Sequence, residues 1–340
     1  MTTFDPPIQR TQPTSRAFEL RDGRLAWFIL GTLVVTVLAS TLLSGSNLLT
    51  FDLAAVYAIA AIGLNVIFGL GGLLSIAQAA IMAVGAYALV LSLNNWAIGV
   101  VPALVLACVL GAVSSGITGL VSIRIRSHYF ILASVALAEG VVLIITNDIG
   151  LTGGSNGLGL MKSTDLFGLQ LSNPHDFALL AVPLAGLVWY LAACLRVSRF
   201  GIALHASRSD DYLALASAIP VHRCRLWATV VGGAFGGLAG GMLALLNGYI
   251  GPQDFGIETA VLLLLMVVFG GAASNGGTVV AAIILTALAQ GLLTVTSVGD
   301  LVYGVAILLL LIFAREGLSG LGQLVLKYAI RWAPHRSRRV

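Results

Sequence analysis

Ten apolar stretches, separated by short polar intervals, run through almost the whole chain. A helix needs about 20 predominantly apolar residues to cross the hydrocarbon core of a bilayer, and most of the stretches approach that length. The pattern predicts an all-α, polytopic integral membrane protein with about ten transmembrane helices. The predicted spans are 25–43, 51–68, 74–93, 97–120, 128–146, 176–195, 226–247, 257–271, 278–296 and 300–314.

One polar interval, 196–225, differs from a simple connection between spans. It carries an acidic pair, Asp210 and Asp211, inside a run rich in alanine and leucine. It also holds five arginines: Arg196, Arg199, Arg208, Arg223 and Arg225. A chain that lies mostly in lipid but keeps such a segment outside is expected to offer that segment to a partner.

The positions of lysine and arginine predict the orientation of the chain, because these residues collect in cytoplasmic loops. Four lie before residue 25, two in 121–127, five in 196–225 and six after residue 314. With ten alternating spans, seventeen of the eighteen fall on one side, and Lys162 falls on the other. We therefore expect both termini and 196–225 to be cytoplasmic and the loop 147–175 to be external.

These boundaries divide the chain into a cytoplasmic N-terminal tail (1–24), a transmembrane domain (25–314) and a basic cytoplasmic C-terminal tail (315–340). The first apolar run, 25–43, exceeds the roughly 7–15 residues of a signal-peptide core. We expect it to be a retained span. The basic C-terminal tail is a candidate for binding anionic lipid.

Composition supports the membrane class and argues against several others. Only 9% of residues are charged and 58% are hydrophobic, with a mean hydropathy of +0.99, whereas about a quarter of a soluble domain is charged. The basic pI of 9.1 follows from the cytoplasmic arginines, so no nucleic-acid partner is expected. The three cysteines, Cys108, Cys194 and Cys224, have no CxxC spacing, and no cluster of metal ligands is recognisable.

The inventory of catalytic motifs argues against an enzyme. A GxxxxGK[ST] phosphate loop is absent, since Lys162 follows Met161 and Lys327 follows Leu326. The five histidines lie at the edges of predicted spans or outside them, which disfavours an intramembrane serine protease. We expect a chain without catalytic residues or bound cofactors that moves or anchors something.

Three glycine-rich segments stand out between the apolar stretches. The turn 68–73 is echoed by 269–277, and the external loop begins with Leu-Thr-Gly-Gly-Ser-Asn-Gly-Leu at 151–158. Glycine-interrupted segments in comparable places indicate an internal repeat around a transport path. A second pair of similar segments, 136–140 and 287–291, is separated by a different number of residues. Both pairs cannot belong to one repeat, so the internal repeat is left open.

Polar residues inside the spans are candidates for the transport path. Glu139 lies near the centre of the fifth span, where a charge is costly; it either lines a path or anchors helices through a hydrogen bond. Asn65, Ser75 and Gln78 accompany Gly71 and Gly72 in the second and third spans. A tight helix interface, with small residues and polar cross-links, explains that group equally well.

Four further acids flank spans at the predicted external side. Solvated helix ends explain most of them. They are Asp52, Asp254, Glu258 and Asp300.

Several blocks of the sequence resemble the LivM-type permeases of ABC importers for branched-chain amino acids, amides and urea. The similar blocks are 63–80, 128–130, 151–157, 257–266 and 270–271, and their order and spacing cover roughly residues 50–320. The resemblance implies a permease subunit in a bacterial plasma (inner) membrane. It also implies a second, LivH-like permease, two ABC ATPase subunits that use the ATP, and an extracytoplasmic solute-binding protein.

The resemblance suggests positions for the path and for contact with the ATPases. The path is expected between the two permeases near the glycine-rich turns, with Gly154, Ser155 and Asn156 at the binding protein or the outer mouth, and Glu258 as a further candidate. The segment from about Ala203 to Ile219 resembles a coupling helix. Its candidate residues are Ala203, Arg208, Asp210, Asp211, Ala214 and Ala218.

Two departures from the family pattern concern helix ends. Ala218 stands where relatives usually have a glycine that ends the helix, and Ala314 stands where a proline is common. The first bears on how the coupling segment ends. The second concerns only the exit of the last span.

Two other functions remain compatible with the residues. A secondary transporter would use Glu139 to couple transport to protons. A purely structural scaffold is the other alternative, but it gives little reason for the one-sided segment 196–225. Within the importer reading, the solute could be a branched-chain or related amino acid, urea, a short amide or an aromatic acid.

Overall fold

The computed structural model describes residues 45–293, apart from 97, 125–126, 162–164, 167–168 and 172, together with Gly31 and Thr36. The predicted spans 25–43 and 300–314 and both terminal tails lie outside the described residues, apart from those two isolated positions. The prediction of an all-α membrane protein is confirmed, because seven described helices are long and apolar enough to cross a membrane. The last described helix, α12 (Asn275–Leu293), has a shorter apolar part, Asn275–Gly291.

The eight predicted apolar segments from 51–68 to 278–296 all form helices, and their bounds differ from the observed ones by up to five residues. Residues 294–296 of the last segment lie outside the described residues. The second segment ends in a π-helical turn, η2 (Asn65–Leu70). The long helices are α2 (Ser46–Leu64), α3 (Gln78–Trp96), α4 (Val100–Arg124), α5 (Ser127–Asn147), α7 (Pro174–Val197), α10 (Val221–Asn247), α11 (Ile257–Gly270) and α12 (Asn275–Leu293).

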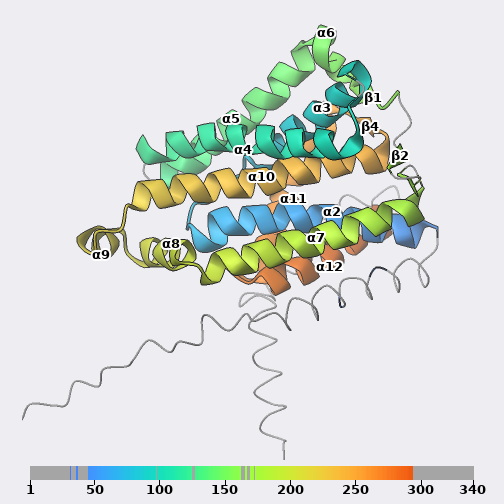
Figure 1. Ribbon diagram of the computed structural model, residues 1–340. Helices are drawn as coiled ribbons and strands as arrows, with labels where there is room; N and C mark the ends of the chain where they lie inside the picture. Colours follow the sequence, from blue (N-terminus) through green and yellow to red (C-terminus); the bar gives the residue numbers. More distant parts are fainter. Residues whose placement is uncertain are drawn as a thin grey trace, which may run out of the picture.

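Shorter elements gather at the two ends of the helix bundle (Figure 1). At the α8 end lie α8 (Arg199–Ser209) and α9 (Asp211–Ala216). The opposite end is called the loop end. It contains α6 (Ile149–Thr152), η3 (Gly154–Asn156), β1 (Leu158–Gly159), β2 (Asp165–Leu166), β3 (Leu169–Gln170), β4 (Tyr249–Ile250) and η4 (Pro252–Phe255).

Two small antiparallel pairings tie the loop end together. Strand β1 pairs with β4, with Leu158 opposite Ile250 and Gly159 opposite Tyr249. Strands β2 and β3 form a separate hairpin of two residues each. The first pairing joins the loop that follows α5 to the residues that follow α10, although about 90 residues separate them in the sequence.

Helix α10 lies at the centre of the bundle and packs against α4, α3 and α2. Three glycine pairs at a spacing of four residues make this packing possible: 232–233, 236–237 and 240–241. A Cβ atom at Gly232 would lie 2.5 Å from the carbonyl oxygen of Gly63 on α2, and one at Gly233 would lie 2.7 Å from that of Gly111 on α4. Small residues at this spacing let helix backbones touch, so α10 is held on two sides at once.

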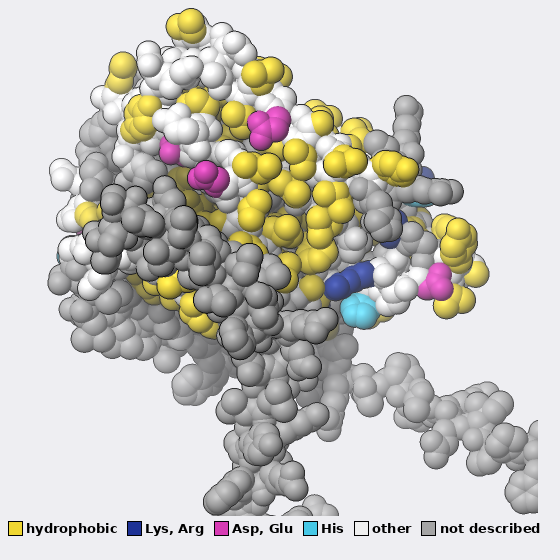
Figure 2. Space-filling model, turned by 180° about the vertical axis from the view of Figure 1, so that it is seen from behind, with side chains coloured by type: hydrophobic (Ala, Val, Ile, Leu, Met, Phe, Trp, Pro, Cys, Tyr) yellow, Lys and Arg dark blue, Asp and Glu magenta, His cyan; other side chains and the backbone are white. Residues whose placement is uncertain are grey.

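The outer helices expose apolar side chains along their length. On α5, the apolar residues Leu132, Ala136 and Leu143 are exposed and share one face, on which Glu139 is the acidic exception. Figure 2 shows hydrophobic side chains across the middle of the molecule, with arginine and histidine side chains at the α8 end. This distribution suits a protein with lipid around its middle and water at its ends.

Candidate functional site

The two glycine-rich turns that echo each other in the sequence lie side by side. Asn65, in the π-helical turn η2, donates from Nδ2 to Oδ1 of Asn275 at 3.0 Å. The Oδ1 atom of Asn65 accepts a hydrogen bond from the main-chain N–H of Ala273 at 2.9 Å. A single buried side chain therefore joins segments that are more than 200 residues apart.

The cross-link by Asn65 compensates a distorted stretch of backbone. Ala273 has a φ of 71°, in the left-handed region that side chains with a Cβ atom rarely adopt. Its N–H is buried against Gly69, where a Cβ atom would lie 2.5 Å from the Ala273 nitrogen. An unpaired buried N–H costs about 1–3 kcal/mol. Asn65 therefore bridges the two turns and also supplies the hydrogen-bond acceptor for the buried N–H of Ala273.

Arg208 connects α8 to the same site. Its Nη1 atom donates to the main-chain oxygen of Gly69 in η2. A Cβ atom at Gly72 would lie 3.0 Å from Cγ of Arg208, and Gly72 has a φ of +69°, so glycine lets the arginine stem lie against the turn. Although Arg208 as a whole is exposed, its guanidinium reaches Gly69 at the edge of the bundle. Contacts therefore run from α8 through Gly69 and Asn65 to Asn275.

The backbone between η2 and α3 corrects one predicted helix start. Residues 74–77 belonged to a predicted span, but α3 begins only at Gln78. The extended segment is stabilised by other hydrogen bonds: Ile76 N–H donates to Oγ of Ser134 on α5, and Ala77 N–H donates to Oγ of Ser75. Irregular backbone inside a bundle persists where protein groups pair with it.

The predicted path residues of the second and third spans are buried among helices. Gln78 donates from Nε2 to the carbonyl oxygens of Ala60, at 3.3 Å, and Gly232, at 3.1 Å. Gly71 and Ser75 are buried as well. The tight helix interface considered from the sequence accounts for all these contacts, and contact with a solute stays a prediction.

The predicted coupling segment forms two helices, which corrects the expectation of one helix from about Ala203 to Ile219. Helix α8 ends at Ser209, and Asp210 is extended, with φ −157° and ψ 116°. Its Oδ1 atom accepts hydrogen bonds from the N–H groups of Tyr212 and Leu213. Because Asp210 caps α9, its side chain stops one helix and starts the next.

The other candidate residues of this segment have distinct positions. Ala203 lies half-buried in α8, Asp211 begins α9, and Ala214 is buried. Ala218 has a φ of 60°, and the N–H of Ile219 bonds back to the carbonyl of Ala214 at 3.0 Å. This is the left-handed helix end that favours glycine, in agreement with the departure noted at this position.

The Thr-Gly-Gly-Ser-Asn-Gly segment at 152–157 forms a compact turn. Gly153, Gly154 and Gly157 have φ values of 73°, 62° and 66°, as their residue type predicts. The hydroxyl of Tyr249 donates to the main-chain oxygen of Asn156. Gly154 is buried, while the side chains of Ser155 and Asn156 are exposed. The last two are therefore accessible to a partner, and Gly154 shapes the turn.

The acidic candidates have contrasting surroundings. Glu139 is exposed near the centre of α5, where it lines a small pocket with Ala79 of α3 and Phe255 of η4, and Glu258 is exposed at the loop end. Asp52 was expected at a solvated helix end, but its exposure is 0%. Neither of its carboxylate oxygens has a hydrogen-bond partner within the described structure. Asp300 lies outside the described residues.

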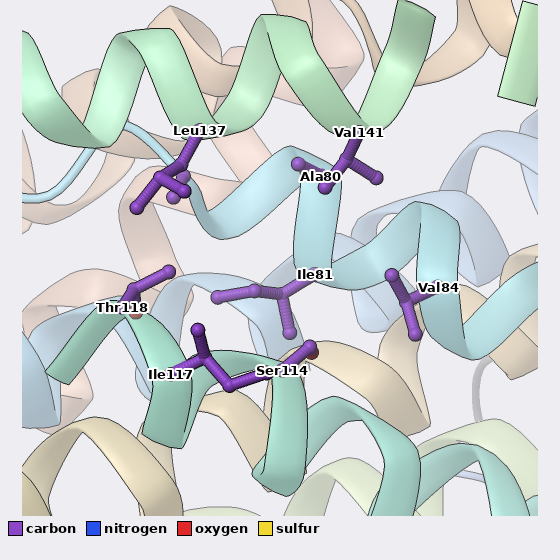
Figure 3. Close-up of a pocket in the computed structure, with 9 residues that line it drawn as sticks. Ala80, Ile81, Val84, Ser114, Ile117, Thr118, Leu137 and Val141 are labelled. Atoms are coloured by element: carbon purple, nitrogen blue, oxygen red, sulfur yellow. The ribbon is translucent and has the colours of Figure 1, made fainter. Parts of the chain in front are cut away.

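An apolar cavity of about 120 Å³ lies between α3, α4 and α5 (Figure 3). Ser114 and Thr118 are its polar wall residues, and their hydroxyls donate to the carbonyls of Gly111 and Ser115 within α4. No charged side chain lines it. The cavity therefore offers little to recognise a polar solute.

Two parts of the site were missed in the sequence. Asn275 and Ala273 lie in the segment 269–277 that the sequence marked, but neither residue was singled out there, because their role depends on contact with Asn65. The glycine pairs of α10 did carry one, a Gly-Gly-x-x pattern repeated three times. Within the described residues, no group of three or more His, Cys, Asp or Glu could hold a metal ion.

Comparisons with known proteins identify the family. The family described as "Branched-chain amino acid transport system / permease component" matches residues 46–314. The chain is 27% identical over 251 residues to the high-affinity branched-chain amino acid transport system permease proteins LivM of Salmonella typhimurium and Escherichia coli. Each match covers 67% of this chain and 59% of the relative, so the chain spans about three fifths of those relatives' length.

A more distant relative and the solved structures complete the comparison. The probable branched-chain amino acid transport permease protein LivM of Methanocaldococcus jannaschii is 27% identical over 145 residues, which cover 42% of this chain and 41% of the relative. No solved structure matches. The family match spans most of the chain, and the apolar helices agree with it. The chain therefore belongs to the family of permease components of branched-chain amino acid transport systems.

Proposed function

We propose that this chain is the membrane-spanning permease subunit of an ATP-driven importer for branched-chain aliphatic amino acids in a bacterial plasma membrane. A second permease, two ATPase subunits and an external solute-binding protein complete the proposed assembly. The names of the relatives support the substrate class. ATP is used by the partner subunits, and this chain supplies part of the transport path.

The orientation follows from the placement of positive charge. The arginines of the described residues lie at the end of α4, the end of α7, in α8 and in the first turns of α10, and α7, α8 and α10 meet at the α8 end (Figure 1). By the positive-inside rule, the α8 end is cytoplasmic in this proposal. Helices α8 and α9 then face the ATPases, and the Thr-Gly-Gly-Ser-Asn-Gly turn faces the binding protein.

The observation that carries the proposal is the contact of Arg208 with Gly69. A displacement of α8 by the ATPases acts on the carbonyl of Gly69, in a π-helical turn, a type of turn frequent at functional sites. Asn65, in the same turn, holds Asn275 and Ala273. Movement of α8 thus reaches the π-helical turn that follows α2 and the start of α12 through packed and hydrogen-bonded groups.

The test uses the complex of both permeases and the ATPases in proteoliposomes with its binding protein. Uptake of labelled L-leucine and L-valine should require ATP and should resist competition by urea, acetamide and L-phenylalanine. Arg208→Met should keep assembly and ATP hydrolysis but reduce uptake about tenfold, since a hydrogen bond from a charged group contributes about 1.5–3 kcal/mol. Arg208→Lys, which keeps a donor, should retain more uptake.

Arg223→Met is the matched control, because Arg223 is exposed on the first turn of α10. It should transport like wild type. Wild-type complexes without ATP-dependent uptake of any aliphatic amino acid would refute the proposed function. Normal uptake by Arg208→Met would refute only the role of the Arg208 contact.

A further inference from the structure

A second cavity, of about 280 Å³, lies at the loop end between α2, α10, α11 and α12. It is larger than the apolar cavity of Figure 3 and has a different chemistry. A water molecule takes about 30 Å³ in the liquid, so this space suits a ligand of roughly ten non-hydrogen atoms. None of the residues proposed from the sequence as path or coupling candidates lines it.

One part of the wall is aliphatic. It consists of Leu49 and Leu53 on α2 and Leu243 and Leu246 on α10. Leu243 is buried, and Leu53 and Leu246 are half-buried, so the bundle holds these three side chains, whereas Leu49 is exposed. Such a wall stabilises a short branched hydrocarbon chain by removing it from water, by about 0.8 kcal/mol for each buried CH₂ group.

Another part of the wall carries a fixed negative charge. Asp254, in η4, accepts the N–H of Gly251 on Oδ2 at 2.8 Å, and its main-chain oxygen accepts the hydroxyl of Thr259 at 2.8 Å. Both Asp254 and Thr259 line the cavity. The first bond orients the carboxylate, and the second holds the backbone of Asp254.

Helix ends reinforce the polarity of the wall. Asn247, the last residue of α10, lines the cavity, and the C-terminal end of a helix attracts positive charge. Thr259 lies in the first turn of α11, where the helix dipole favours negative charge. The exposed Glu258 shares this turn but does not line the cavity. Tyr57 and Gln290 add neutral polar side chains from α2 and α12.

We propose that this cavity is a binding site for a zwitterionic aliphatic amino acid at the external end of the permease. The ammonium group lies at Asp254 and the end of α10, the carboxylate lies toward the first turn of α11, and the leucines hold the side chain. The substrate class rests on the proposed function, whereas the position of the site rests on the cavity. The permease thereby selects its solute a second time after the binding protein.

The experiment measures equilibrium binding of labelled L-leucine to the purified permease–ATPase complex in nanodiscs, without binding protein and without ATP. Asp254→Asn should raise the Kd about tenfold or more, because a charged hydrogen bond is lost. Leu53→Phe should fill the aliphatic part of the cavity, so it should weaken the binding of L-leucine at least several-fold more than the binding of L-alanine. Two leucine analogues should compete poorly with L-leucine for the wild-type complex: 4-methylpentanoate, which lacks the amine, and 3-methylbutylamine, which lacks the carboxylate.

Asp176→Asn is the matched control, because Asp176 lies in the first turn of α7 and does not line the cavity. It should bind L-leucine like wild type. Thr259→Val provides a second polar variant if Asp254→Asn does not assemble, and it should also weaken binding. The site would be overturned if an assembled polar variant, Asp254→Asn or Thr259→Val, and Leu53→Phe all bound L-leucine with an unchanged Kd. Leucine uptake by the wild-type complex would still support the proposed function in that case.

Discussion

Ala218 is a residue whose type conflicts with its backbone. It adopts a φ of 60° at the end of α9, a conformation that costs a residue with a Cβ atom roughly 1–2 kcal/mol. The segment keeps this shape because the N–H of Ile219 bonds back to Ala214 and closes the helix end. The end of α9 is therefore held by hydrogen bonds against an unfavourable residue.

Ala218→Gly should stabilise the end of α9 by about 1 kcal/mol, since glycine enters the left-handed region without the steric cost. Hydrogen exchange of the Ile219 amide should slow about fivefold, because exchange reports local opening. Ala216→Gly, inside α9, should accelerate exchange, as glycine destabilises a helix interior. Equal effects of the two changes would contradict the assigned backbone conformation.

Glu139 is exposed on the described chain, at the centre of an otherwise apolar face of α5. Charged residues at bilayer depth seldom face lipid. In the proposed importer this face meets the second permease or the path. In the rival secondary transporter, the same carboxylate would carry the coupling proton.

Glu139→Gln separates these two functions. It keeps the size and polarity of the side chain but removes its titration, so an ATP-driven importer should keep at least partial uptake. The measurement is leucine uptake in vesicles with ATP present and the proton gradient collapsed, and again with the gradient present and ATP removed. Uptake that follows the proton gradient and disappears in Glu139→Gln would favour the secondary transporter.

At the level of elements, α10 determines how closely the bundle packs. Its paired glycines bring the backbones of α2, α3 and α4 into direct contact with it. A membrane environment supplies little hydrophobic force between helices, so close van der Waals packing carries much of the association. The glycines of α10 therefore belong to the structural framework of the bundle.

Gly240→Ala should destabilise the protein by about 1–3 kcal/mol, the usual effect of overpacking a core. Its Cβ atom would overlap the carbonyl oxygen of Met82 on α3. Gly140→Ala is the control in α5, where no atom lies within 4 Å of the new Cβ atom. It should be neutral or stabilising through helix propensity. Thermal unfolding in detergent measures both, and a loss of equal size in the two variants would contradict this packing.

The whole molecule has two chemically different ends. The α8 end has α8 and α9, with exposed Tyr212. The loop end has the Thr-Gly-Gly-Ser-Asn-Gly turn and the strand pair β1–β4 (Figure 1). In the proposed orientation these ends lie on opposite sides of the membrane.

Cysteine labelling tests this orientation. In a variant whose three cysteines are replaced by serine, Asn156→Cys should react with a membrane-impermeant maleimide in sealed right-side-out vesicles. Tyr212→Cys should react only after the membrane is opened. The native side chains at both positions are exposed, so access to the reagent decides the result. Labelling of both positions in sealed vesicles would rule out the proposed orientation.

Much of the architecture could be predicted from local pattern. The helices 128–146, 176–195 and 257–271 were predicted to within two residues of their observed bounds, because hydropathy is a property of consecutive residues. The start of α3 was predicted four residues too early. Leu74, Ile76 and Ala77 are apolar, and nothing local indicates that Ser134 and Ser75 pair with an extended backbone there.

The sequence by itself determined the class of the molecule, an all-α membrane protein, because each helix needs only its own apolar run and internal hydrogen bonds. It also marked the glycine-rich turns and the segment around Arg208. Only the tertiary structure decided that the guanidinium of Arg208 reaches Gly69, that Asn65 joins Asn275, and that four leucines and Asp254 line one cavity. Those contacts depend on which helices approach closely, which is decided by packing between residues far apart in the chain.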